Sequence, residues 1–182
     1  MLGRFWKTTI TSEEMGASLA NSHFGNWSER LGNFAKLFNL DIKKETEKRF
    51  SIESAILHSF TAVFPVTQTE TITSDTSLKM RFSDSYHQNA ADLLARHGWV
   101  KDDFVFWNKI TVSRYNEYAE KFKSRIQGAP QGGQMIGFAF LCHVDPDATT
   151  EQFLSAAIPI EVWVLSTVGE FSKRLAKFRI KN

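Results

Sequence analysis

The sequence predicts an all-α fold, a single-domain irregular bundle of six to eight helices around a central buried helix. The prediction starts from residues 49–65, where apolar side chains cover roughly 240° of a helical wheel. A surface helix needs an apolar stripe of only about 100°, so this segment should have neighbours on most sides. We expect it to end before Pro65, because proline lacks an N–H and disfavours helix in the preceding residue.

Two long amphipathic segments support this fold class. Each carries apolar residues spaced three or four apart, the repeat of one helix face. They are Phe104, Trp107, Thr111, Tyr115, Tyr118, Phe122 and Ile126, and then Val164, Val168, Phe171, Leu175 and Phe178. We expect these helices to close around the central one, and a chain of 182 residues is long enough to bury such a core in one domain.

The first helices have recognisable start and stop signals. Residues 1–11 should form an irregular lead-in. Ser12, followed by two acidic residues, predicts a helix start, and Gly25 predicts its end. Asn26 or Ser28 can cap a second helix.

Signals of the same kind bound the next helix. A polar linker, with a short exposed strand as an alternative, is expected at 66–77, and a helix at 77–97 capped by Asp75 or Thr76. Gly98 is well placed to end that helix.

The C-terminal third is ambiguous between helix and strand. Residues 135–144 and 158–165 are short and apolar, so their periodicity does not distinguish the two. One alternative is therefore an α+β fold with a small hairpin in 135–165. We prefer helix for the second segment, with Pro159 in the first turn, where proline is tolerated.

Composition excludes several functional classes. The net charge of +2 is too small to indicate a nucleic-acid partner. The single Cys142 can form neither an intramolecular disulfide nor a cysteine-based zinc site, which fits a cytoplasmic location. No signal peptide is expected. The most apolar run, 153–168, is shorter than the ~20 residues of a membrane span.

Aromatic residues are the unusual part of the composition. The chain has 16 Phe and 5 Trp, and this Phe content is about double ordinary usage. An aromatic core explains the excess most simply. The alternatives are a pocket for an apolar ligand and an aromatic contact surface.

Glu53 and His58 are the candidate functional residues of the central helix. Glu53 falls within the apolar arc, where a carboxylate needs a cationic or hydrogen-bonding partner, or a raised pKa. The competing interpretation places it in an exposed first turn. His58 belongs to a narrow polar seam and either bonds a neighbouring helix or acts as a ligand or general base. Tyr115 and Tyr118 complete the set of candidate ligand-binding residues.

No catalytic or metal-binding motif accompanies these residues. The chain lacks the Glu-x-x-His pairs of a di-iron bundle, a Gly-x-Ser-x-Gly elbow and a phosphate-binding glycine loop. Catalytic residues, metal ligands and cofactors are therefore predicted as none. We favour a non-enzymatic interaction domain that associates with itself or with another protein. A small-molecule binder with an aromatic-lined cavity is the second hypothesis, and an enzyme with a site near Glu53 and His58 is the third.

Overall fold

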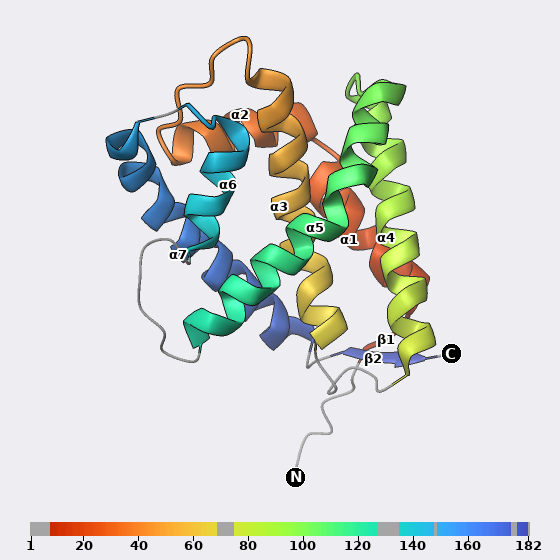
Figure 1. The fold of residues 1–182 in the computed structure, drawn as a ribbon. Coiled ribbons are helices and arrows are strands. Elements are labelled where there is room, and N and C mark those ends of the chain that lie inside the picture. The colour runs from red at the N-terminus through yellow and green to blue at the C-terminus, as the bar shows by residue number, and fades with distance from the viewer. Residues whose placement is uncertain (1–7, 69–74, 127–134, 148, 176–177, 182) are drawn as a thin grey trace.

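A computed structural model describes residues 8–68, 75–126, 135–147, 149–175 and 178–181 of the chain (Figure 1). These residues form a bundle of seven α-helices, which confirms the predicted all-α class, together with two short strands. The elements are β1 (Thr8–Thr11), α1 (Ser12–Phe24), α2 (Trp27–Leu37), α3 (Glu47–Gln68), α4 (Thr76–Arg96), α5 (Lys101–Ile126), α6 (Ile136–Val144), α7 (Thr150–Leu175) and β2 (Phe178–Lys181).

Helix α3 is the centre of the bundle, as the sequence predicts. Every residue from Phe50 to Val66 is buried. Figure 1 shows α3 between α6 and α7 on one side and α1 and α4 on the other, with α5 crossing it. The helix does not end before Pro65 but continues to Gln68, so that prediction is wrong. Pro65 lies in the last turn, where the bundle buries it and only one helical hydrogen bond is lost.

Helix α1 packs very closely against α4. A Cβ atom at Gly16 would lie 2.6 Å from the carbonyl oxygen of Phe82, so only glycine allows this crossing. The cap of α1 is Thr11, one residue earlier than expected. Its hydroxyl accepts from the Glu14 amide at 3.1 Å, and the Glu14 carboxylate accepts from the Thr11 amide at 2.9 Å. The close crossing places His23 of α1 beside Tyr86 of α4.

The ends of α4 match the sequence signals. The carboxylate of Asp75 accepts a backbone hydrogen bond in the first turn. Gly98 has a φ of +87° and donates to the carbonyl of Ala95, while Trp99 donates to that of Leu94. This is the glycine-ended Schellman arrangement, and it places the Trp99 indole against the core.

Both ambiguous segments are helical, so the alternative hairpin in 135–165 is wrong. Residues 158–165 lie in the middle of α7, and Pro159 is therefore in the helix interior and not in its first turn. Pro159 is exposed and removes one N–H donor from the helix. Helix α6 crosses α7 closely at Gly137, where a Cβ would lie 2.1 Å from the Ala157 carbonyl oxygen.

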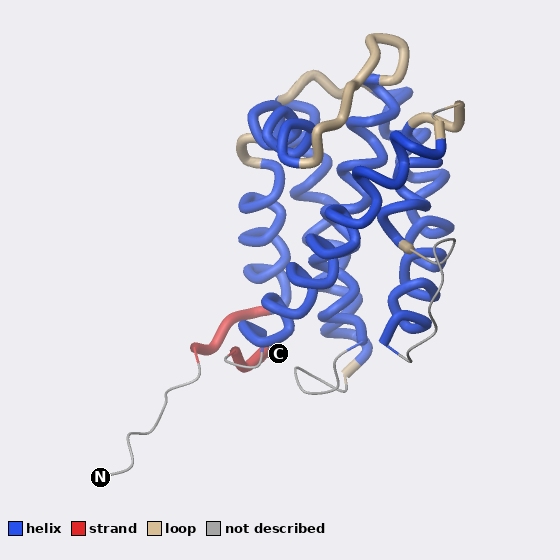
Figure 2. Tube along the Cα trace, turned by 90° about the vertical axis from the view of Figure 1, so that its left-hand side faces the viewer, coloured by secondary structure: helices blue, strands red, loops and turns tan. Residues whose placement is uncertain are grey.

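The two strands were not foreseen. Residues Thr8–Thr11 pair in parallel with Phe178–Lys181 at one end of the bundle (Figure 2). Phe178, which the sequence placed on the last helix, therefore begins β2. The described part of 1–11 is a strand, and residues 1–7, 69–74 and 127–134 lie outside the described residues. None of the described helices has the length and apolar character needed to cross a membrane.

Candidate functional site

Glu53 is fully buried and has the cationic partner that burial demands. Its side chain is 0% exposed. Arg114 of α5 contacts both carboxylate oxygens, with Nη2 at 3.0 Å from Oε1 and Nε at 3.1 Å from Oε2. The interpretation of Glu53 as an exposed first-turn residue is therefore wrong. A paired, enclosed carboxylate of this kind is costly to break, and it fixes α5 against α3.

His58 lies in a cage of aromatic rings. The ring centroids of Trp27, Phe34 and Trp163 are 5.5, 5.2 and 4.9 Å from its own. The sequence suggested a hydrogen bond from His58 to a neighbouring helix. Instead, Nδ1 donates to the Ser54 carbonyl of the same helix, at 2.8 Å. Burial lowers the pKa of His58 to about 4, helped by the positive Arg30 and opposed by the bond to Ser54.

The two candidate tyrosines have different surroundings. The Tyr118 hydroxyl is buried with no hydrogen-bond partner among the described residues, and burial together with the nearby Glu53 carboxylate raises its pKa. The Tyr115 hydroxyl lies 3.0 Å from Nε2 of His87 on α4. The four predicted residues thus fall in three separate places around α3.

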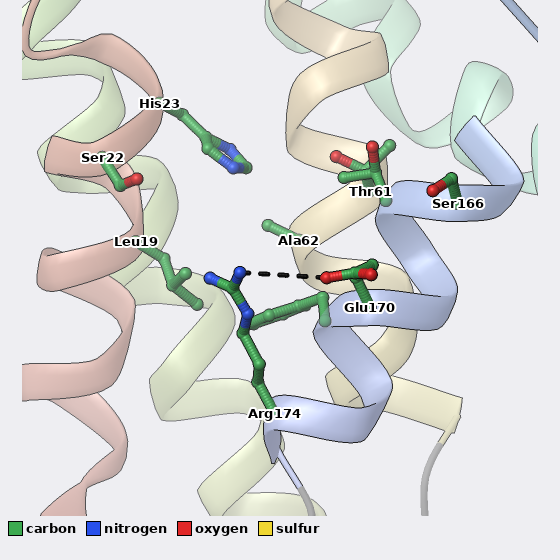
Figure 3. Close-up of a pocket in the computed structure, with 10 residues that line it drawn as sticks. Leu19, Ser22, His23, Thr61, Ala62, Ser166, Glu170 and Arg174 are labelled. Carbon is green, nitrogen blue, oxygen red and sulfur yellow. Dashed lines mark ion pairs between the residues drawn. The ribbon is translucent and has the colours of Figure 1, made fainter. Parts of the chain in front are cut away.

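A cleft of about 300 Å³ between α1, α3 and α7 is the best candidate for a binding site, and we call it cleft A. Figure 3 shows His23 pointing into this space from α1, while Glu170 and Arg174 approach from α7. Its walls combine apolar and polar side chains. They are Leu19, Ser22, His23, Thr61, Ala62, Ser166, Thr167, Glu170, Phe171 and Arg174.

Cleft A has a buried floor and a charged mouth. Thr61 is only 1% exposed, and its hydroxyl donates to the His58 carbonyl at 2.8 Å. At the mouth, Glu170 and Arg174 are exposed and lie 3.8 Å apart. Such an exposed pair is worth little, so both groups are available to a bound molecule.

His23 links the floor of cleft A to the core. Its Nδ1 lies 2.8 Å from the Tyr86 hydroxyl, which leaves Nε2 for the cleft. Burial, together with the neighbouring His58 and Arg30, lowers the pKa of His23 to about 3. The ring is therefore neutral at physiological pH, with one nitrogen donating and the other accepting.

A second cleft, cleft B, lies between α3, α4 and α5 and measures about 330 Å³. Aromatic side chains, including Phe60 and Phe64, form much of its lining. Its polar lining includes Tyr115 and His87, and Nδ1 of His87 donates to the Ser83 carbonyl at 2.8 Å. His87 and Tyr115 are thus engaged with each other.

Ser59 of α3 lies between the two tyrosine–histidine pairs. Burial raises the pKa values of Tyr86 and Tyr115, and the Ser59 hydroxyl lies close enough to both phenols to oppose that effect. Ser59 is fully buried and makes no hydrogen bond of good geometry within the described residues. The His23–Tyr86 and His87–Tyr115 pairs are therefore two separate hydrogen-bonded units, each with Ser59 nearby.

A third hollow of about 420 Å³, beside Trp27 and Trp99, is larger but chemically less promising. Its buried Ser51 hydroxyl already accepts from both indoles, at 3.2 and 3.3 Å. Its His97 ring lies 3.2 Å from the Gly25 carbonyl. Within the described residues, no group of three or more His, Cys, Asp or Glu side chains could hold a metal ion.

Sequence reasoning missed the residues that build cleft A and Tyr86, the hydroxyl that contacts His23. Neither His23 nor Tyr86 was among the predicted site residues. Residues 23 and 86 are 63 positions apart, so spacing gave no signal. The contact between them depends on the packing of α1 against α4, which the periodicity of neither segment reveals.

Comparison with known proteins finds no matching family model, no similar curated protein and no similar solved structure. The function must therefore be inferred from the chemistry of the clefts.

Proposed function

We propose that the protein binds a small polar molecule in cleft A. The observation that carries this proposal is that the buried Thr61 and the neutral His23 ring line the same space. Ligand sites are concave and mostly preformed, with a few polar groups that fix orientation. Cleft A has this composition, and its 300 Å³ suits a compact metabolite.

Burial of a titratable ring at a cleft supports the same proposal. Strongly perturbed pKa values cluster at functional sites, and the pKa of His23 is lowered to about 3. A histidine held neutral in this way contributes a hydrogen bond without a charge. We assign binding and not catalysis, because no nucleophile or paired acid and base is identified at the cleft floor.

Retention of small molecules from a cell extract tests the proposal. The purified protein is incubated with a metabolite extract, separated by gel filtration and denatured, and the released compounds are identified by mass spectrometry. Ser166→Trp places a large ring at the rim of cleft A from an exposed position. Ser113→Trp makes the same change at an exposed site of α5 and is the matched control.

The proposal predicts a compound that the wild type and Ser113→Trp retain and Ser166→Trp does not. Equal retention by both variants would place binding elsewhere. If the wild type retains nothing, the proposal is contradicted.

Self-association is a second candidate, supported by exposed apolar side chains on α7. Ile158 and Val162 are 55% and 60% exposed and lie one turn apart. Burial of such a pair between two copies would be favourable. Sedimentation velocity tests it: a dimer that Val162→Lys dissociates supports self-association, and a monomer at all concentrations contradicts it.

A further inference from the structure

Cleft B has an aromatic wall that is already formed in the folded protein. Phe60 and Phe64 of α3 stack with their ring centroids 4.9 Å apart, and Tyr115 of α5 meets Phe60 edge-on at 6.0 Å. Phe60 is 1% exposed and Phe64 is 9% exposed, so core packing holds these rings in place. Aromatic rings attract a further ring in offset-stacked or edge-to-face contact. The wall therefore offers a preformed surface for a planar ring.

The threonine hydroxyl groups of cleft B are used within the protein. Thr67 donates to the carbonyl of Phe64 at 3.0 Å, and Thr111 donates to the carbonyl of Trp107 at 2.6 Å. Each of these bonds returns to the helix that carries the threonine. A hydroxyl group has a single hydrogen, so neither threonine has one left to donate to a ligand.

His87 and Tyr115 form a closed pair at the same cleft. Burial lowers the pKa of His87, so the ring is neutral at physiological pH. The Ser83 carbonyl, 2.8 Å from Nδ1, can only accept, which places the single N–H of the ring on Nδ1. Nε2 then accepts from the Tyr115 hydroxyl at 3.0 Å. The imidazole N–H and the phenol hydrogen are therefore both used within the protein.

The described lining of cleft B carries no charged side chain. Among the described residues that line it, none is Asp, Glu, Lys or Arg. Lys79 lies beside the lining residue Thr67, to whose carbonyl its Nζ donates at 3.0 Å. Gln68 and Asn116 are exposed and supply amide groups at the rim. An ion that entered would lose water without a charged partner in the lining, so the cleft favours a neutral molecule.

We propose that cleft B is a second binding site, which takes a neutral molecule with one or two aromatic rings against Phe60 and Phe64 and a polar group at the amide rim. The cleft measures about 330 Å³, whereas a dry apolar cavity of about 150 Å³ holds one benzene ring. The size therefore suits one or two rings. The inference does not depend on cleft A, because the two clefts have no described lining residue in common.

Four small probes of similar size test the ligand class. Benzyl alcohol, benzylamine and benzoate carry the same ring and differ in charge, and cyclohexylmethanol is neutral without an aromatic ring. Titrations followed by ¹⁵N–¹H chemical shifts give a Kd for each. Benzyl alcohol should bind the wild type at least about tenfold more tightly than either ion. It should bind about twofold to tenfold more tightly than cyclohexylmethanol, the added effect of an aromatic pair. An ion or cyclohexylmethanol that binds as tightly as benzyl alcohol would overturn the ligand class.

Two matched variants of α5 test the location of the site. Side chains on a helix lean toward its N-terminus, so Asn116→Trp places a ring over cleft B from an exposed rim position. Asn108→Trp makes the same change at an exposed position two turns earlier, outside the lining. Asn116→Trp should abolish saturable binding of benzyl alcohol, and Asn108→Trp should retain the wild-type Kd. Equal binding by the two variants, or no saturable binding by the wild type, would overturn the inference and leave the test of cleft A with Ser166→Trp unaffected.

Discussion

Mild acid should destabilise this protein, because two of its histidines are held neutral in the fold. The pKa is lowered from 6.5 to about 3 at His23 and to about 4 at His58, with burial as the largest cause at both. As pH falls through about 6.5, the unfolded chain takes up a proton at each position and the folded chain does not. The free energy of unfolding therefore decreases as pH falls, until the folded-state pKa values are reached.

The size of this effect follows from the two shifts. Between about pH 7.5 and about pH 5.5, each histidine should lower the free energy of unfolding by about 1.3 kcal/mol. The two together remove about 2.6 kcal/mol, a large share of a typical domain stability of about 5–15 kcal/mol. His87, whose pKa burial also lowers, adds to the loss in the same direction.

Urea unfolding of the wild type and of His58→Phe at both pH values measures the contribution of His58. The variant removes one titrating ring from the aromatic cage. Its free energy of unfolding should therefore fall by about 1.3 kcal/mol less than that of the wild type between the two pH values, whatever its stability at neutral pH. Thr61→Val is the control, since it changes a group bonded to His58 without removing a titrating one. If the free energy of unfolding of His58→Phe falls by as much as that of the wild type, His58 is not held neutral by burial and the reasoning is refuted.

Three further predictions concern the packing around the clefts, and urea unfolding tests each. Ser51→Ala leaves two buried indole N–H groups without an acceptor and should lower the free energy of unfolding by about 2–4 kcal/mol. Ser54→Ala removes a hydroxyl with no partner among the described residues and should leave stability nearly unchanged. Equal losses in the two variants would contradict this prediction. Gly137→Ala should lower the free energy of unfolding by about 2–3 kcal/mol, because its Cβ would lie 2.1 Å from a backbone oxygen. Gly169→Ala, whose Cβ would have no atom within 4 Å, should raise it by about 0.5–1 kcal/mol. Loss of stability at both positions would contradict the steric explanation. Arg114→Met should lower the free energy of unfolding by about 3–5 kcal/mol, because it leaves the buried Glu53 carboxylate unpaired. Adding Glu53→Leu should restore most of this loss. A double variant as unstable as Arg114→Met alone would contradict the pairing.

The central helix could be predicted because its signal is local. Apolar residues around the whole wheel of 49–65 require neighbours on most sides, and α3 is buried from Phe50 to Val66. Its C-terminal boundary was predicted wrongly, because tertiary packing outweighs the single helical bond that Pro65 removes. The strand pair could not be predicted, because β1 and β2 are four residues each and lie at opposite ends of the chain.

The candidate site was predictable only in part. The wheel of α3 showed that a buried Glu53 would need a partner, but not that Arg114, 61 residues away, would supply it. His58 was recognised as part of a narrow polar seam. Its partner is a carbonyl of its own helix, a bond that leaves no trace in the sequence. Cleft A arises where α1, α3 and α7 meet, and Gly16 sets the approach of α1 through a backbone contact with α4. Such contacts follow from the packing of distant segments and not from periodicity.

The central claim is that the protein binds a small polar molecule in cleft A. Native mass spectrometry tests it most directly, on protein purified from its own host at low salt. We predict an adduct of metabolite mass on the wild type and on Ser113→Trp, which disappears from Ser166→Trp. The mass of the adduct would restrict the identity of the compound, and fragmentation of the released molecule would establish it. A wild type free of any adduct, or an adduct that Ser166→Trp retains in full, would contradict the claim.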